Sequence, residues 1–209
     1  MSMTFVQIQN AVLADRFRES QRSDCKQWIN HRYAWIWALE EWTFAEAVSA
    51  TPVPTANQRV LASVPADFGQ AISLLNASGR ELTPMADMRA FYARYGDGAK
   101  GDPEAYTVVG SAIHLGPIPQ STSTCTLVYR KEPTALAGDS DVPALPEGFH
   151  FALVHGAAAE GLKLQNDPTW QAFEQDFQAS ITTLQRRFVQ GIRASEEQFG
   201  AHRPDLGWG

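Results

Sequence analysis

The feature that most constrains this chain is a narrow apolar stripe close to its C-terminal end. Between residues 169 and 199, apolar side chains recur at steps of three and four residues. They are Trp170, Phe173, Phe177, Ile181, Leu184, Phe188 and Ile192. This spacing predicts one long amphipathic helix with a single apolar edge. At about 1.5 Å per residue, some thirty residues span roughly 45 Å, so the helix needs a long partner surface.

Two further helices are expected before residue 50. Residues 4–17 carry Phe5 and Ile8 at helical spacing. Residues 24–46, after a candidate N-cap at Ser23, form an aromatic helix. Its predicted main face is Cys25, Trp28, Trp35, Leu39 and Trp42, with Tyr33, Trp37 and Phe44 off that face. A helix that is apolar on two sides is buried on two sides, at the centre of a domain or against another subunit.

The middle of the chain changes character and favours strands. Short strands are expected at 59–64, 68–75, 105–109, 111–115 and 124–130, the last three pairing antiparallel, with a short helix at 85–95. Residues 146–164 form another helix, whose small residues allow a neighbouring helix to approach closely. Those small residues are Gly156, Ala157, Ala158, Ala159 and Gly161.

This order of elements predicts an α+β fold, a helical bundle with a long C-terminal helix plus a small antiparallel β region inserted between helices. The expected organisation has N-terminal helices at 1–49 and a β-rich insertion with one short helix at 50–145. C-terminal helices at 146–199 pack with 1–49 as one helical domain, and a tail follows at 200–209.

The composition excludes several classes of protein. Hydrophobic residues make up 44% and charged residues 19%, which is typical of a packed globular chain rather than a disordered one. A net charge of -6 without a basic stripe argues against a protein that recognises nucleic acid through its grooves. The two cysteines, Cys25 and Cys125, form no CxxC pair and are expected as reduced thiols. No secretory leader and no membrane span are expected.

No residue set predicts catalysis, a cofactor or a metal. Glu147 and His150 have the best metal-ligand spacing, but His150 is better explained by a hydrogen bond to the backbone. Asp139 and Asp141 resemble a fragment of a calcium loop without its glycine and final glutamate, so a solvated loop is favoured. Cys25 lies among tryptophans, where a thiol is buried and inert.

The stretch from residue 106 to residue 162 goes beyond generic patterning. A strand ending in Tyr-Arg is followed by the pattern P..L......P.LPE.FH..LV..A...GL. This stretch resembles the head-to-tail adaptor family of tailed phages, the connector proteins below the portal. The positions that carry the resemblance are Tyr106, Ile113, Leu115, Pro117, Pro119, Tyr129, Arg130, Pro133, Leu136, Pro143, Leu145, Pro146, Phe149, His150, Leu153 and Val154. The aromatic stretch WINHRYAWIWALEEW, from Trp28 to Trp42, and the long final helix also resemble the family.

The resemblance implies a structural virion protein and not an enzyme. Adaptors of this kind form a ring, typically twelve-fold, that joins the portal to tail, stopper or nozzle proteins and continues the DNA channel. The implied location is the virion connector, after synthesis in the host cytoplasm. The acidic balance would keep the channel from gripping DNA that slides past.

Aromatic side chains are the expected contacts with neighbouring copies and with the portal. The predicted interface residues are Trp28, Trp35, Trp37, Trp42, Trp170, Phe177, Phe188 and Trp208. One alternative keeps the structural class, a tail-completion or stopper protein of the same connector. The other is a small hydrolase or carbohydrate-binding protein, which needs a cleft of convergent polar residues.

Overall fold

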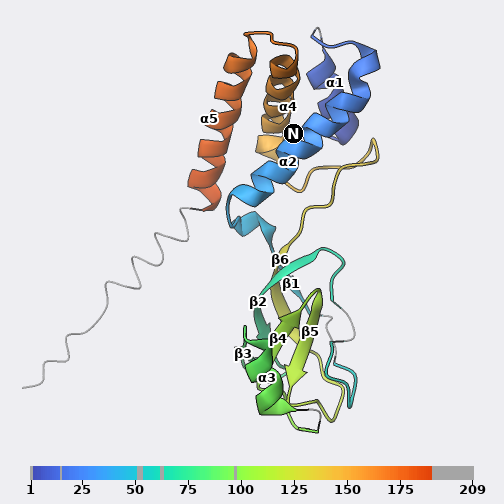
Figure 1. The fold of residues 1–209 in the computed structure, drawn as a ribbon, viewed down its shortest axis with the longest axis vertical. Helices are drawn as coiled ribbons and strands as arrows, with labels where there is room; N and C mark the ends of the chain where they lie inside the picture. The colour runs from blue at the N-terminus through green and yellow to red at the C-terminus, as the bar shows by residue number, and fades with distance from the viewer. Residues whose placement is uncertain (1, 15, 51–53, 62–63, 97, 190–209) are drawn as a thin grey trace, which may run out of the picture. The chain divides into compact units, whose positions relative to one another are not determined.

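The chain forms two compact units, Met1–Phe44 with Pro133–Gly209, and Ala45–Glu132. The computed structural model describes residues 2–14, 16–50, 54–61, 64–96 and 98–189. The first unit is helical and the second is built mostly from strands, as Figure 1 shows. The predicted α+β fold is therefore confirmed. We call the two parts the helical unit and the β unit.

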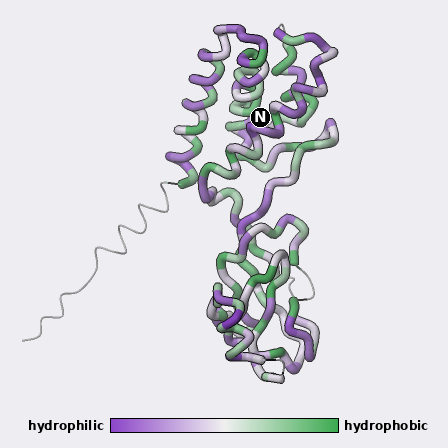
Figure 2. Tube along the Cα trace, viewed as in Figure 1, coloured by the Kyte–Doolittle hydropathy of each residue, from purple (hydrophilic) through white to green (hydrophobic). Residues whose placement is uncertain are grey.

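The helical unit consists of α1 (Phe5–Leu13), α2 (Arg22–Leu39), α4 (His150–Leu164) and α5 (Trp170–Phe188). Helix α4 packs against the other three, as expected for a helix with ten of its fifteen residues buried. Figure 2 shows that α5, in contrast, carries hydrophobic positions at intervals among hydrophilic ones. Its buried residues are Phe177, Ile181 and Leu184, part of the predicted stripe. The predicted continuation to residue 199 lies outside the described residues.

Two glycines of α4 allow the neighbouring helices to approach closely. A Cβ atom on Gly156 would lie 2.9 Å from the Phe177 ring of α5. A Cβ atom on Gly161 would lie 2.5 Å from the Trp28 ring of α2. Real side-chain contacts are longer than this, so only glycine fits at these positions without a shift of the neighbour. The predicted role of the small residues is confirmed.

Helix α2 differs from the prediction in its ends and in its buried face. It begins before Ser23 and ends at Leu39, because Glu40 adopts an extended conformation. Its buried residues are Cys25, Trp28, Ile29, Tyr33 and Ile36, so the predicted face containing Trp35 and Leu39 was wrong. Trp42 lies beyond the helix end, where its Nε1 donates to the carbonyl oxygen of Ile36 at 2.8 Å. The central helix is α4, not α2.

A strap, which we define as residues 136–145, holds the start of α1. The amide of Phe5 donates to the carbonyl oxygen of Asp141 at 2.7 Å, and the amide of Val6 to that of Asp139 at 3.1 Å. The first amides of a helix have no partner within the helix. Backbone carbonyls of the strap therefore complete the N-terminus of α1.

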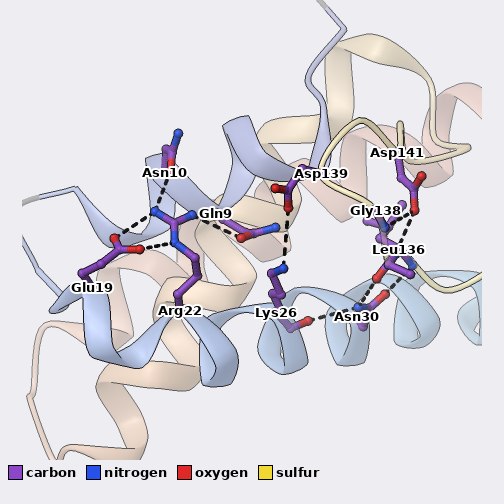
Figure 3. A network of polar contacts seen from close by, with 11 residues as sticks. Gln9, Asn10, Glu19, Arg22, Lys26, Asn30, Leu136, Gly138, Asp139 and Asp141 are labelled. Atoms are coloured by element: carbon purple, nitrogen blue, oxygen red, sulfur yellow. Dashed lines mark hydrogen bonds and ion pairs between the residues drawn. The ribbon is translucent and has the colours of Figure 1, made fainter.

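The strap is in turn fixed to α2, as Figure 3 shows. The Asn30 side chain donates to the carbonyl oxygen of Leu136 at 2.9 Å and accepts from its amide at 2.8 Å. Lys26 Nζ lies 3.5 Å from the Asp139 carboxylate. The Asp141 carboxylate accepts the amides of Ala137 and Gly138, which lowers the pKa of Asp141. The predicted loop at Asp139 and Asp141 is confirmed, with Asp139 exposed to solvent, and its backbone is fixed to α2.

The β unit contains two small sheets. In the first, β6 (Thr126–Lys131) lies between β1 (Glu46–Ser49) and β2 (Phe68–Leu75), antiparallel to both. In the second, β4 (Ala105–Val109) lies between β3 (Thr83–Pro84) and β5 (Ala112–Gly116). The buried core includes residues of both sheets: Leu74, Tyr106, Ile113, Leu115 and Leu127.

Several predictions for this region need correction. The last predicted strand pairs with β1 and β2 and not with β5, because order along the chain does not determine which strands pair. In 59–64, the described residues form only isolated bridges, at Val60 and Leu61. Helix α3 (Met88–Tyr95) begins later than predicted, because the Asp87 side chain caps it and Pro84 belongs to β3.

The boundaries between the two units lie near the expected residues but do not coincide with them. Residues 46–49 were placed with the N-terminal helices, yet they form β1 and pair with β6. Pro133 follows β6, and the segment from there to 145 belongs to the helical unit. The short length of β1, four residues, leaves too little periodicity for its detection from sequence.

Candidate interaction surface

Three of the predicted interface residues lie in the core of the helical unit. Trp28, Trp42 and Phe177 are buried. The Trp28 ring packs on Phe17 with centroids 5.2 Å apart, and Trp42 stacks on Phe44 at 5.5 Å. Since the chain itself covers these side chains, their burial gives no support to a contact with another protein.

Two more of the predicted residues share an aromatic cluster at the end of α5. Trp37 and Phe188 are half-buried, and both rings meet Phe44, at 5.6 Å and 5.4 Å between centroids. Part of each side chain stays accessible. Trp208 lies outside the described residues.

Trp35 and Trp170 are the predicted residues with the clearest surface position. Trp35 is 36% exposed, and one side of its ring meets Phe177 at 5.4 Å. Trp170 is half-buried, and Lys163 Nζ lies 5.2 Å from the centre of its ring. Trp170 borders a separate hollow along α5, whereas Trp35 lines a depression between α2 and α4.

This depression is a groove with a volume of about 530 Å³. Its lining residues are His31, Arg32, Trp35, Glu160, Lys163 and Leu164. Leu164 is 68% exposed, so the groove has apolar walls together with charged groups. We call it the α2/α4 groove.

An ion-pair network forms the floor of the α2/α4 groove. Arg32 Nε lies 3.2 Å from Glu160, and Arg32 Nη2 lies 3.0 Å from Glu174 of α5. His31 Nδ1 lies 2.9 Å from the Glu160 carboxylate. The Arg32 guanidinium also lies over the Phe177 ring at 5.0 Å. One arginine therefore joins α2, α4 and α5, and holds the groove in shape.

A second exposed apolar surface is centred on Phe151 of α4. Phe151 is 57% exposed and lies 6.3 Å from the His155 ring, which in turn meets Phe173 of α5 at 6.2 Å. The Arg16 guanidinium covers Phe173 at 4.4 Å. We call this set the Phe151 ridge. Sequence reasoning missed Phe151 because it lies off the predicted apolar side of its helix.

The groups that could carry chemistry have structural roles. The amide of Met3 donates to His150 Nδ1 at 2.9 Å, so Nε2 carries the proton and donates to the carbonyl oxygen of Leu145 at 3.0 Å. This confirms the backbone explanation for His150. Cys25 and Cys125 are buried free thiols; burial raises the pKa of Cys25 to about 11 and also raises that of Cys125. Both thiols are therefore poor nucleophiles near neutral pH.

Neither metal ligation nor membrane insertion is indicated within the described part of the chain. No three or more His, Cys, Asp or Glu side chains gather there in a way that could hold a metal ion. The helices described here are all too short or too polar to cross a membrane.

Comparison with known families gives one match. The model of the SU10 adaptor protein family matches residues 3–201. The chain belongs to this family. The resemblance to phage head-to-tail adaptors is thereby confirmed. A search of curated proteins finds no significant match. As an SU10 adaptor protein, the chain is a structural protein of a bacteriophage virion, from a family that is not one of enzymes.

Proposed function

We propose that this protein is a head-to-tail adaptor whose copies form a ring, twelve-fold as in the adaptors it resembles. One end of the ring binds the portal, the other binds tail, stopper or nozzle proteins, and DNA passes through the channel that the ring continues. The single observation that supports this proposal most strongly is the family match over residues 3–201. No cofactor takes part.

The surface of the helical unit gives physical support to ring formation. A ring of more than two copies needs two unlike faces on each subunit, because every contact is heterologous. The helical unit has two unlike apolar surfaces, the α2/α4 groove and the Phe151 ridge.

The predicted interface is accordingly narrowed to residues that retain exposed surface. We propose that Trp35 and Trp170 contact neighbouring copies, and that Trp37 and Phe188 contact another connector protein. The tail at 200–209, with Trp208, is proposed to contact the portal. The net charge of -6 is proposed to keep DNA moving freely, because a low density of basic groups binds few phosphates.

Mixing the chain with the portal ring of its own phage tests this function. Native mass spectrometry should show a mass increase of twelve times 23.0 kDa, without any added cofactor. Substitution Trp208→Ala should weaken the complex, whereas Gln178→Ala, at an exposed position on α5, should not.

Electron microscopy of the virion provides the second arm of the test. Density for the chain should touch the portal. Density on the tail tube alone would favour a tail-completion or stopper protein, and no binding to portal at any ratio would overturn the proposal.

A further inference from the structure

We propose that a groove in the β unit receives an extended peptide segment of a tail, stopper or nozzle protein, which adds as a strand to the edge of β4. The groove lies between β2 and β4, past the end of β3, and has a volume of about 280 Å³. It is lined by residues 69–71, 84–86 and 106–108, and we call it the β2/β4 groove. This proposal rests on the proposed function, since it names one contact of the adaptor with its tail-side partner.

The groove begins where Pro84 ends the pairing of β3. The segment that contains β3 is joined to β2 by a hydrogen bond of 2.8 Å from the amide of Leu82 to the carbonyl oxygen of Leu74. Alternate residues of a strand direct their backbone groups to the same side, so Pro84 also faces β2, where it has no N–H to donate. Residues 69–71 of β2 continue past this point and form one wall of the groove.

The opposite wall is the edge of β4, which extends beyond its pairing with β3. The two strands pair in parallel at Thr83 and Pro84. The amide of Met85 donates to the carbonyl oxygen of Tyr106 at 2.8 Å, and this bond ends the ladder within the described part of the chain. By the same alternation, the next backbone groups of β4 on this side are the N–H and C=O of Val108. Val108 lines the groove and is 42% exposed.

The pairing of β4 with β5 gives the same direction for Val108. Its partner in the antiparallel register is Ile113. The carbonyl oxygen of Ile113 accepts the amide of Leu61 at 3.0 Å, on the side of β5 that faces away from β4. In such a pair both residues point their backbone groups outward, so those of Val108 point away from β5 and toward the groove.

Of the two walls, β4 is the one that suits a further strand. Strand β2 pairs with β6 through two register shifts, next to Gly69 and Ile72. Bulges of this kind protect a strand edge from further pairing. Strand β4 pairs with β5 in an unbroken register from Ala105 to Val109. The added strand is therefore hydrogen-bonded to β4, and β2 encloses it on the other side.

The chemistry of the lining indicates which kind of ligand the groove takes. All the residues that line it are uncharged, and Gln70, Tyr106 and Thr107 are the polar ones. Phosphate groups of DNA are bound by basic side chains, which this lining does not supply. A neutral peptide backbone, with one donor and one acceptor per residue, matches the N–H and C=O of Val108.

The two walls also decide between a second copy and another protein. Because β2 and β4 border the groove from both sides, only a strand that is unpaired along both of its edges can enter. Strands β1 to β6 each pair within a sheet of this chain. A second copy therefore offers no free strand among its described residues. The occupant is an extended segment of a different protein, bound by the strand-addition mode.

Hydrogen exchange measures whether the groove is occupied. The chain is assembled on its portal, and the purified tail-completion, stopper and nozzle proteins of the same phage are added one at a time. Exchange at the Val108 amide should slow at least about tenfold with one of them, because the amide gains an acceptor. The Val109 amide is the internal control, since it faces β5 and should exchange at an unchanged rate.

Substitutions at the groove test the contact by binding. Val108→Pro removes the N–H without removing a bond to β5, a position at which strands tolerate proline, and should weaken binding of that protein at least about tenfold. Val108→Thr keeps the amide and should bind like the unmodified chain. Ala86→Trp should block the groove, whereas Ala93→Trp, at an exposed position of α3 outside the lining, should not.

The outcomes separate this inference from the proposed function. Unchanged exchange at Val108 with every added protein, or full binding by both Val108→Pro and Ala86→Trp, would overturn the inference and leave the adaptor function standing. Slow exchange at Val108 in the chain alone would also overturn it, because the chain itself would then cover the edge. Failure of the unmodified chain to bind portal would remove the function. If Val108→Pro does not fold, exchange at Val108 in the unmodified chain decides.

Discussion

At the scale of single residues, the packing of the helical unit depends on two glycines of α4, which have no side chain. Helix α4 can lie at the centre of the unit because Gly156 and Gly161 leave room for the rings of Phe177 and Trp28. Glycine within a helix costs up to about 1 kcal/mol relative to alanine. At these positions the close approach of the neighbouring helices outweighs that cost.

The direction in which Gly161→Ala changes the free energy of unfolding can therefore be predicted. Helix propensity alone would stabilise the variant by up to about 1 kcal/mol. The added Cβ would lie 2.5 Å from the Trp28 ring, which is itself packed against Phe17, so overpacking should prevail. We expect a net loss of about 1–3 kcal/mol in the free energy of unfolding.

Urea unfolding followed by tryptophan fluorescence measures this loss. Gly148→Ala is the control, because a Cβ there has no neighbour within 4 Å. An equal or greater stability of Gly161→Ala would show that Trp28 can move aside, and that the approach of α2 to α4 is not fixed by this glycine.

The buried thiol of Cys25 predicts a loss of stability in alkaline solution. Burial raises the pKa of Cys25 from its ordinary 9.0 to about 11, so the unfolded chain ionises before the folded one. The stabilisation is complete below pH 9 and declines as the pH rises to 11, by up to about 3 kcal/mol.

The measurement is the slope of the free energy of unfolding against pH. Cys25→Ala should flatten the decline between pH 9 and 11, and only the contribution of Tyr33, whose pKa burial also raises, should remain above about pH 10. Cys125→Ala is the matched control, because Cys125 lies in the β unit and tryptophan fluorescence does not report on it. An unchanged slope in Cys25→Ala would contradict this assignment.

At the scale of elements, the strap shows how a segment without regular structure can organise two helices. Its carbonyls complete the start of α1, and the Asn30 side chain binds it as a neighbouring backbone would. The amide of Ala144 adds a further hydrogen bond to the Tyr33 hydroxyl at 3.0 Å.

Substitution Asn30→Ala should loosen the strap and the start of α1 together. The loss of both bonds to Leu136 should cost about 1–3 kcal/mol, because the half-buried backbone groups are left without their partner. Hydrogen exchange should accelerate at the amides of Phe5 and Val6, whose acceptors belong to the strap. Gln178→Ala, which removes only a bond to Glu174 at 2.8 Å within α5, should leave that exchange unchanged. Protection of Phe5 and Val6 in Asn30→Ala would show that the strap is held by its other contacts.

How much of the fold was predictable differs between elements for a physical reason. Helix α5 and strand β2 were placed well because local periodicity determines both. The partners of β6 and the buried face of α2 were predicted wrongly, because both depend on contacts between distant segments. The α2/α4 groove was missed for the same reason. It is lined jointly by Trp35 of α2 and Leu164 of α4, residues that no local pattern relates.

At the scale of the whole molecule, the chain separates an aromatic helical unit from a β unit that contains none of its tryptophans. All six belong to the residues of the helical unit, namely Trp28, Trp35, Trp37, Trp42, Trp170 and Trp208. The β unit has its own core, and its two ends are paired strands, with Glu46 opposite Arg130. Domains whose two chain ends lie close together are typically able to fold when they are produced separately.

Residues 45–132 should therefore fold when produced alone. We expect dispersed amide resonances and a cooperative thermal transition, because the two sheets share a buried core within this segment. The chain with 45–132 replaced by a short Gly-Ser linker should retain the tryptophan fluorescence of the intact helical unit. A fragment that stays unfolded would show that the β unit depends on the helical one.

The pairing of β1 with β6 has an evolutionary consequence. A segment that leaves and re-enters its host at neighbouring points can be gained, lost or replaced without disturbing the packing of the four helices encoded before and after it. Related chains can then differ in residues 45–132 while the packing of the helices is inherited unaltered.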